Sequence, residues 1–196
     1  MGHYFSERPE AERRPGQADL VLPDLHLRLE TDSGVFSPDR VDLGTKILLE
    51  TVPPPPQHGD LLDLGCGYGP IALTMASRAP GATVWAVDVN RRAIELTARN
   101  ARAARLDKVR SVHVDEVPDD VTFQAIWSNP AIRIGKAALH EMLTRWLSRL
   151  APGGAAYLVV QKHLGSDSLQ RWLGEQGWRA SREASRASYR VLRVER

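Results

Sequence analysis

Two short stretches of this 196-residue chain hold residue types whose spacing suits chemistry: residues 61–70 read LLDLGCGYGP, and residues 128–136 read SNPAIRIGK. Glycines in the first stretch permit a tight turn and let a ligand approach the backbone closely. This stretch therefore predicts a nucleoside-cofactor site. The second stretch predicts a site that holds an amine for methylation.

The acid at the start of the glycine-rich stretch bears on the kind of cofactor. Asp63 ends a predicted strand, where it would repel a pyrophosphate and attract a sulfonium or an amino-acid ammonium. A dinucleotide fingerprint would also need a third glycine where this chain has Pro70. We therefore expect a cofactor that is cationic at this end, such as S-adenosylmethionine.

Two further acids follow at the ends of successive predicted strands. Asp88 comes about 20 residues after the glycines, the place from which a carboxylate accepts hydrogen bonds from the hydroxyls of a ribose. Asp115 ends the third strand and can accept from an adenine amino group. The alternative is a set of tight turns with helix-capping acids. Cys66 also lies in the turn, where we expect a small buried residue and no nucleophile, because no histidine is near it in the sequence.

The second stretch suits the methylation of an exocyclic amine, whose lone pair is delocalised. The side-chain oxygen of Asn129 and the backbone carbonyl of Pro130 can accept both N–H bonds and turn the lone pair toward the methyl group. Ile132 can pack on the flat face of the target, and Arg133 or Lys136 can hold a phosphate. This chemistry needs no metal. The alternatives are a structural Asn-Pro turn and a solvated lysine at a helix start.

Strand-like and helical runs alternate in a way that predicts an α/β fold. The predicted strands are 61–64, 83–87, 109–114, 123–127 and 155–160, and the predicted helices are 71–79, 91–104 and 137–150. This pattern indicates a Rossmann-like, doubly wound, mostly parallel sheet with helices on both faces. Residues 177–194 suit a closing antiparallel pair.

The prolines at 53–56 separate this core from a different region. Residues 1–56 are expected to form an N-terminal extension, with a hairpin turning at 32–34 and a helix over 39–51 that starts near Ser37 and Pro38. Residues 57–196 are expected to form the core, and the two parts to make one domain. Tyr4 and Phe5 can fold over the cofactor as a lid.

Composition places the chain among soluble globular proteins, with 42% hydrophobic and 26% charged residues and no apolar run of membrane-spanning length. We expect a cytoplasmic protein that is a monomer or a weak dimer. A net charge of +2 points only weakly to a polyanion. Arginines gather in two segments, 91–105 and 179–196, which are either nucleic-acid-binding patches or ordinary solvated surfaces.

The chain resembles the small methyltransferase domain of the ribosomal RNA guanine-N2 methyltransferases, which are class I S-adenosylmethionine-dependent enzymes. The resemblance covers nearly the whole chain and rests on HYFSERP, LRLETDSGVFSPDRVDLGTKILLE, LLDLGCGYGPIAL, Asp88 and SNPAIRIGK. It implies S-adenosylmethionine as methyl donor and RNA as partner. The cofactor-binding set is then Phe36, Asp63, Gly65, Cys66, Gly67, Asp88, Val89, Asp115 and Asn129, and the target amine lies among Asn129, Pro130, Ala131 and Ile132.

Two departures from this family keep other functions open. The family usually has a second proline where this chain has Ala131, and proline would stiffen the loop that aims the two acceptors. Ribosomal members also often carry an additional N-terminal domain that grips RNA. The alternatives are therefore methylation of a small molecule or a protein glutamine, or a catalytically weakened module that binds cofactor or RNA.

Overall fold

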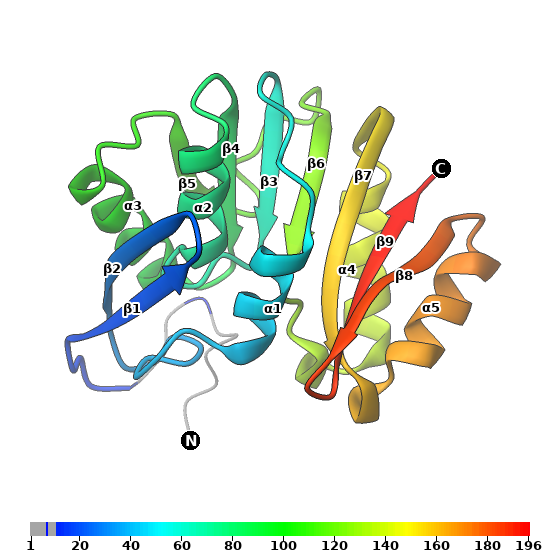
Figure 1. Ribbon diagram of the computed structural model, residues 1–196, viewed down its shortest axis with the longest axis horizontal. Helices are drawn as coiled ribbons and strands as arrows, with labels where there is room; N and C mark the ends of the chain where they lie inside the picture. Colours follow the sequence, from blue (N-terminus) through cyan, green and yellow to red (C-terminus); the bar gives the residue numbers. More distant parts are fainter. Residues whose placement is uncertain (1–6, 8–10) are drawn as a thin grey trace.

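A computed structural model describes Glu7 and residues 11–196 of the chain (Figure 1). Its elements are β1 (Gly16–Leu22), β2 (Leu25–Thr31), α1 (Leu43–Thr51), β3 (Asp60–Leu64), α2 (Pro70–Arg78), β4 (Thr83–Asp88), α3 (Arg91–Ala103), β5 (Val109–His113), β6 (Phe123–Ser128), η1 (Ile132–Ile134), α4 (Lys136–Leu147), β7 (Leu150–Gln161), η2 (Lys162–Leu164), α5 (Ser166–Glu175), β8 (Arg179–Arg186) and β9 (Tyr189–Glu195). The residues of the expected lid, Tyr4 and Phe5, lie outside the described part.

The main sheet has seven strands in the order β5-β4-β3-β6-β7-β9-β8. Strands β3 to β7 run parallel, and β9 pairs antiparallel with both β7 and β8. The predicted Rossmann-like fold with an antiparallel C-terminal end is confirmed. Helix α5 was not predicted, although its buried Leu169 and Leu173 recur at helical spacing.

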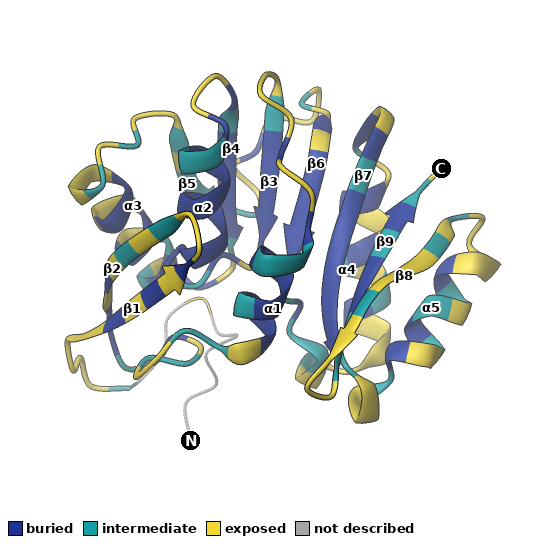
Figure 2. Cartoon of the chain, in the orientation of Figure 1, coloured by how far each residue is buried: buried dark blue, intermediate teal, exposed yellow. Residues whose placement is uncertain are grey.

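Helices cover both faces of this sheet, and the strands between them are buried (Figure 2). Buried residues of α1, α2 and α3 pack with one face in a single hydrophobic cluster. Those of α4 and α5 pack with the other face in a second cluster. Strands enclosed on both sides have near-continuous apolar sequences, which is why the core strands could be recognised in the sequence.

The N-terminal hairpin differs from the prediction. Strand β2 pairs antiparallel with β1, which precedes it, so the turn falls between Leu22 and Leu25 rather than at 32–34. Asp32 is instead buried and accepts a hydrogen bond from the Arg14 backbone N–H at 2.6 Å. The hairpin is tied to α3 by Asn100, whose side chain exchanges hydrogen bonds with the Glu30 backbone.

The first helix also begins later than predicted, at Leu43. Its N-cap is Asp42, whose carboxylate accepts a hydrogen bond from the Thr45 N–H at 3.1 Å, so Ser37 and Pro38 lie in the loop before it. This loop brings Val35 and Phe36 to the edge of the sheet where the strands end. Within Glu7 and residues 11–196, no helix is long and apolar enough to cross a membrane.

Replacing Leu158 of β7 tests how much the buried face of the sheet contributes to stability. Its side chain is fully buried, so we expect Leu158→Ala to lower the free energy of unfolding by about 2–5 kcal/mol. Leu43, which is 47% exposed on α1, is the matched control, and Leu43→Ala should change it by less than about 0.5 kcal/mol. Urea unfolding measures both, and equal effects of the two substitutions would contradict this account of the core.

Candidate active site

A cavity of about 550 Å³ opens at the carboxyl ends of β3, β4, β6 and β7. Open α/β sheets bind ligands at this edge. Its walls come from the glycine-rich loop after β3, the turns after β4 and β6, the end of β7, and the segment from Val35 to Thr45. The lining is mostly apolar with a few polar groups, as in cavities that enclose small organic molecules.

The glycine-rich loop forms the tight turn that its sequence indicates. Gly65, Gly67 and Gly69 have φ angles of 80°, 56° and 96°, in the left-handed region that favours glycine. A side chain added at Gly65 or Gly67 would meet no described atom within 4 Å. The backbone at these two glycines therefore borders open space on the cavity side.

Asp88 holds this loop to the start of α3. One carboxylate oxygen accepts from the Gly67 N–H at 3.0 Å and the other from the Asn90 N–H at 2.9 Å. Burial raises the pKa of Asp88, and these backbone hydrogen bonds oppose that rise. A carboxylate can accept about four hydrogen bonds, so Asp88, which lines the cavity, keeps acceptor capacity for a ligand.

Asp63 does not line the cavity. Its side chain is completely buried, and Oδ2 accepts a hydrogen bond at 2.9 Å from the Ala72 N–H in the first turn of α2. Within the described chain Oδ1 has no hydrogen-bond partner, and burial raises the pKa of Asp63 well above its usual range, with a further rise from Asp88. The Asp63 side chain thus caps the first turn of α2 from within the core and does not border the cavity.

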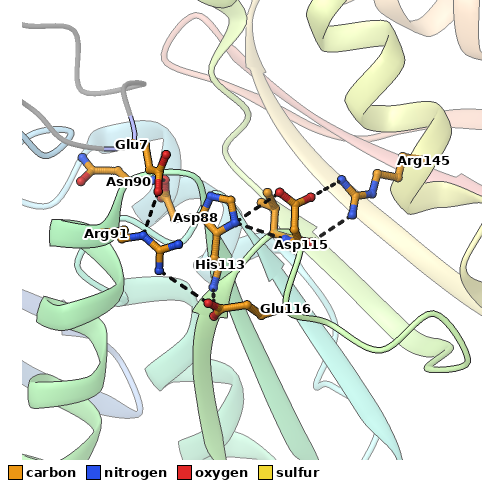
Figure 3. A network of polar contacts seen from close by, with 9 residues as sticks. Glu7, Asp88, Asn90, Arg91, His113, Asp115, Glu116 and Arg145 are labelled. Atoms are coloured by element: carbon orange, nitrogen blue, oxygen red, sulfur yellow. Dashed lines mark hydrogen bonds and ion pairs between the residues drawn. The ribbon is translucent and has the colours of Figure 1, made fainter.

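Asp115 also lies away from the cavity, because β5 ends two residues earlier, at His113. Its side chain is 67% exposed, forms an ion pair with Arg145 at 3.1 Å and lies 3.5 Å from His113 Nδ1. Figure 3 shows this network, in which Asp115 points toward Arg145. Val114 lines the cavity in its place. The structure therefore does not bring Asp115 to the cofactor position that the sequence suggested.

Asn129 follows β6, and its amide is held in one orientation. Nδ2 donates to Asp42 Oδ2 at 2.8 Å and to Thr45 Oγ1 at 3.0 Å. Because both amide hydrogens are engaged, Oδ1 is the group left without a hydrogen-bond partner in the described chain. Asp42 and Thr45 line the cavity as well. Sequence reasoning did not assign them a role, although the D-x-G-T pattern that contains them was a usable signal.

The residues after Asn129 form a compact turn. The Pro130 carbonyl accepts a hydrogen bond from the Ile132 N–H at 2.8 Å, with Ala131 at φ −71° and ψ 79°. These angles are those of an inverse γ-turn. Ala131 therefore already has the φ that a proline would impose, and the Pro130 carbonyl keeps its second lone pair.

The other predicted site residues divide into two groups. Those that line the cavity together with the Asn129–Ala131 turn are Phe36, Cys66, Val89, Ile132 and Arg133. Lys136 is instead an exposed residue at the start of α4.

The Cys66 thiol is buried, and burial raises its pKa well above the usual range. A thiol in that state is a poor nucleophile, in agreement with the interpretation of Cys66 as a packing residue.

The fold and the cavity define a Rossmann-like α/β protein with a small-molecule site at its strand ends. The model of the methyltransferase small domain family matches residues 26–193, and the chain belongs to this family. The resemblance seen in the sequence is thus confirmed.

Two relatives and one solved structure extend this comparison. The chain is 32% identical to the Bacillus subtilis (strain 168) protein YbxB, described as uncharacterized, over 99% of this chain and 98% of that protein. It is 38% identical to ribosomal RNA small subunit methyltransferase C of Hahella chejuensis, over 82% of this chain and 50% of that enzyme. The structure of the T. thermophilus 16S rRNA N2 methyltransferase in complex with AdoMet and guanosine matches with a TM-score of 0.76 and 25% identity, over 93% of this chain and 50% of that one. The chain therefore spans about half the length of these ribosomal RNA methyltransferases.

The raised pKa of the buried Asp63 predicts how the stability of the protein depends on pH. Its raised pKa means that the folded protein disfavours the carboxylate, so this group reduces stability increasingly as the pH rises above the unfolded-state pKa of about 3.9. We expect Asp63→Asn, which keeps an acceptor for the Ala72 N–H, to gain stability relative to the unsubstituted protein between about pH 4 and pH 7. Urea unfolding across this range measures the difference, and a difference independent of pH would contradict the assignment.

Proposed function

We propose that this protein is an S-adenosylmethionine-dependent methyltransferase that methylates the 2-amino group of guanine in ribosomal RNA. The observation that carries the proposal is the fixed amide of Asn129, which leaves an acceptor oxygen beside the Pro130 carbonyl. We expect the protein to act in the cytoplasm as a monomer or weak dimer.

The cavity residues fit S-adenosylmethionine. The open backbone at Gly65 and Gly67 can accommodate the amino-acid end, and the Asp88 carboxylate keeps acceptor capacity for a ribose hydroxyl. Phe36 and Val89 are apolar side chains that stay 39% and 38% exposed beside the cavity, where they can cover a flat adenine. Asp63 and Asp115 do not line this cavity, and we assign them no contact with the cofactor.

The second part of the site suits an amine that must be made nucleophilic. Asn129 Oδ1 and the Pro130 carbonyl would each accept one N–H of the target, which favours a pyramidal nitrogen with its lone pair directed at the methyl group. S-adenosylmethionine, when bound, supplies an activated methyl group with a good leaving group. The residues of the chain then need only to orient the amine and hold it close.

Cations near the cavity support an RNA substrate. Arg133 lines the cavity, and Arg40, Lys136 and Lys162 are exposed on neighbouring segments at the strand-end edge. Within the described part of the chain none of the four has an ion pair, so they are available to phosphates. The C-terminal arginines differ, because Arg179, Arg182, Arg186, Arg190 and Arg193 all form ion pairs with acids of the chain.

Methyl transfer tests the function directly. Ribosomal RNA from cells that lack this protein is incubated with the enzyme and methyl-labelled S-adenosylmethionine, and we expect the label in N2-methylguanosine. Asn129→Ala should lower kcat about 100-fold, because it removes an acceptor that acts on the reacting amine, while calorimetric binding of the cofactor stays within about threefold. Lys136→Ala is the control for a cation away from the amine and should mainly raise KM. Label in another nucleoside, or no cofactor binding, would contradict the proposal.

A second prediction concerns the replacement of Ala131 by proline. Since its φ of −71° already suits proline and its N–H donates no hydrogen bond in the described chain, Ala131→Pro should be tolerated. It should raise the free energy of unfolding by about 0.4–1 kcal/mol through the unfolded state, with turnover on RNA equal to or above that of the unsubstituted enzyme. Thermal unfolding and the labelling assay measure the two effects. A large loss of turnover would show that the turn needs alanine.

A further inference from the structure

Gln161 and Tyr189 form a polar pair in the cavity that the reaction described above does not use. Gln161 ends β7 and Tyr189 begins β9, and the two are direct partners across the antiparallel ladder. Gln161 Nε2 donates a hydrogen bond to the Tyr189 hydroxyl at 2.7 Å. Both residues are half-buried and line the same cavity as Asn129.

The position of Tyr189 is set by close packing against the start of α1. A side-chain carbon added at Gly44 would lie 2.6 Å from Tyr189 Cε1 and 2.9 Å from Asp42 Oδ2. The tyrosine ring and the Asp42 carboxylate therefore flank the same point. Because Asp42 Oδ2 also accepts from the Asn129 amide, the Gln161–Tyr189 pair lies beside the residues that would hold the target amine.

The register of the sheet also places Gln161 beside the turn that follows β6. Ser128 of β6 is the partner of Leu158 in β7, so the Asn129–Ala131 turn leaves the sheet next to the last residues of β7. Gln161 is the last of these residues. Its amide nitrogen is engaged by Tyr189, and within the described chain its carbonyl oxygen has no hydrogen-bond partner. The pair therefore offers one hydrogen-bond acceptor close to the amine position.

An acceptor at this place distinguishes the exocyclic amines of the RNA bases. The amines of adenine and cytosine are each flanked on the Watson–Crick edge by an unprotonated ring nitrogen, which would face the Gln161 oxygen as a second acceptor. The 2-amine of guanine is instead flanked by the N1–H donor. A site acceptor that pairs with an N–H of the correct base favours that base over one that presents a second acceptor there.

On the basis of the proposed function, we propose that Gln161 Oε1 accepts the N1–H of the target guanine and thereby selects guanine over the other bases that carry an amine. Tyr189 is a positioning residue, because its hydroxyl receives Gln161 Nε2 and so keeps the carbonyl oxygen available. The Asn129 and Pro130 acceptors hold the amine, and Gln161 identifies the ring to which the amine belongs.

Two substitutions of similar length test this role with the labelling assay on ribosomal RNA. Gln161→Met removes the acceptor and should lower kcat/KM for N2-methylguanosine formation at least about tenfold, mainly through KM, because the contact exists before and during the reaction. Gln161→Glu keeps an acceptor that the Tyr189 hydroxyl can donate to, and should stay within about threefold. Cofactor binding and the melting temperature should be unchanged in both. Equal losses in the two variants, or a loss that follows the melting temperature, would overturn the proposal.

Nucleoside competition separates this inference from the proposed function. Guanosine and 2-aminopurine riboside both carry the 2-amine, but only guanosine has an N1–H. The unsubstituted enzyme should be inhibited more strongly by guanosine, and Gln161→Met should lose this preference. A preference that persists in Gln161→Met would overturn the role of Gln161 while leaving the reaction intact. Absence of N2-methylguanosine with the unsubstituted enzyme would instead refute the proposed function.

Discussion

The hydrogen bonds from the Asn129 amide to Asp42 and Thr45 are the interaction on which the rest of the site depends. They join the turn after β6 to the first turn of α1, a segment more than 80 residues earlier in the chain. Asp42 can accept from Asn129 because it also caps α1, and α1 is fixed by Ile47 and Leu48, which are fully buried against the sheet. The orientation of one amide therefore rests on the packing of a helix, and a fixed orientation is what gives Asn129 an acceptor at the target position.

The acids at the strand ends show how one residue type serves different purposes at the same edge. Asp63 and Asp88 both accept backbone N–H groups near the start of a helix, and burial raises the pKa of each. Only Asp88 borders the cavity, so it can both hold the glycine-rich loop and contact a ligand. The cavity is thus shaped by backbone hydrogen bonds to carboxylates, and its own surface stays largely apolar. Such a surface suits a cofactor with a flat base and a target with a flat ring.

The sequence predicts the parts of this architecture that depend on local pattern. Apolar strands alternating with amphipathic helices were sufficient for the sheet and for the placement of the glycine-rich loop and Asn129. Asp63 and Asp115 do not line the cavity, for two different reasons. β5 ends at His113, one residue before the predicted end, and successive side chains of a strand point in opposite directions, so Val114 takes the place expected for Asp115. The end of β3 was predicted correctly, but the Asp63 side chain accepts the Ala72 N–H at the start of α2, a contact that no local pattern reveals. Asp42 was missed although the D-x-G-T pattern contains it, because its role depends on Asn129, a residue distant in the chain. Gln161 was missed because it acts through a contact with Tyr189 that no local pattern reveals.

The central claim is that two acceptors, Asn129 Oδ1 and the Pro130 carbonyl, hold the 2-amine of a guanine toward the methyl donor. A crystal structure of the protein with S-adenosylhomocysteine and guanosine tests it most directly. The account predicts that the guanine 2-amino nitrogen lies within about 3.2 Å of both oxygens and that the amide nitrogen of Asn129 remains bonded to Asp42. A guanine that enters the cavity with its 2-amine directed away from Asn129 would contradict it.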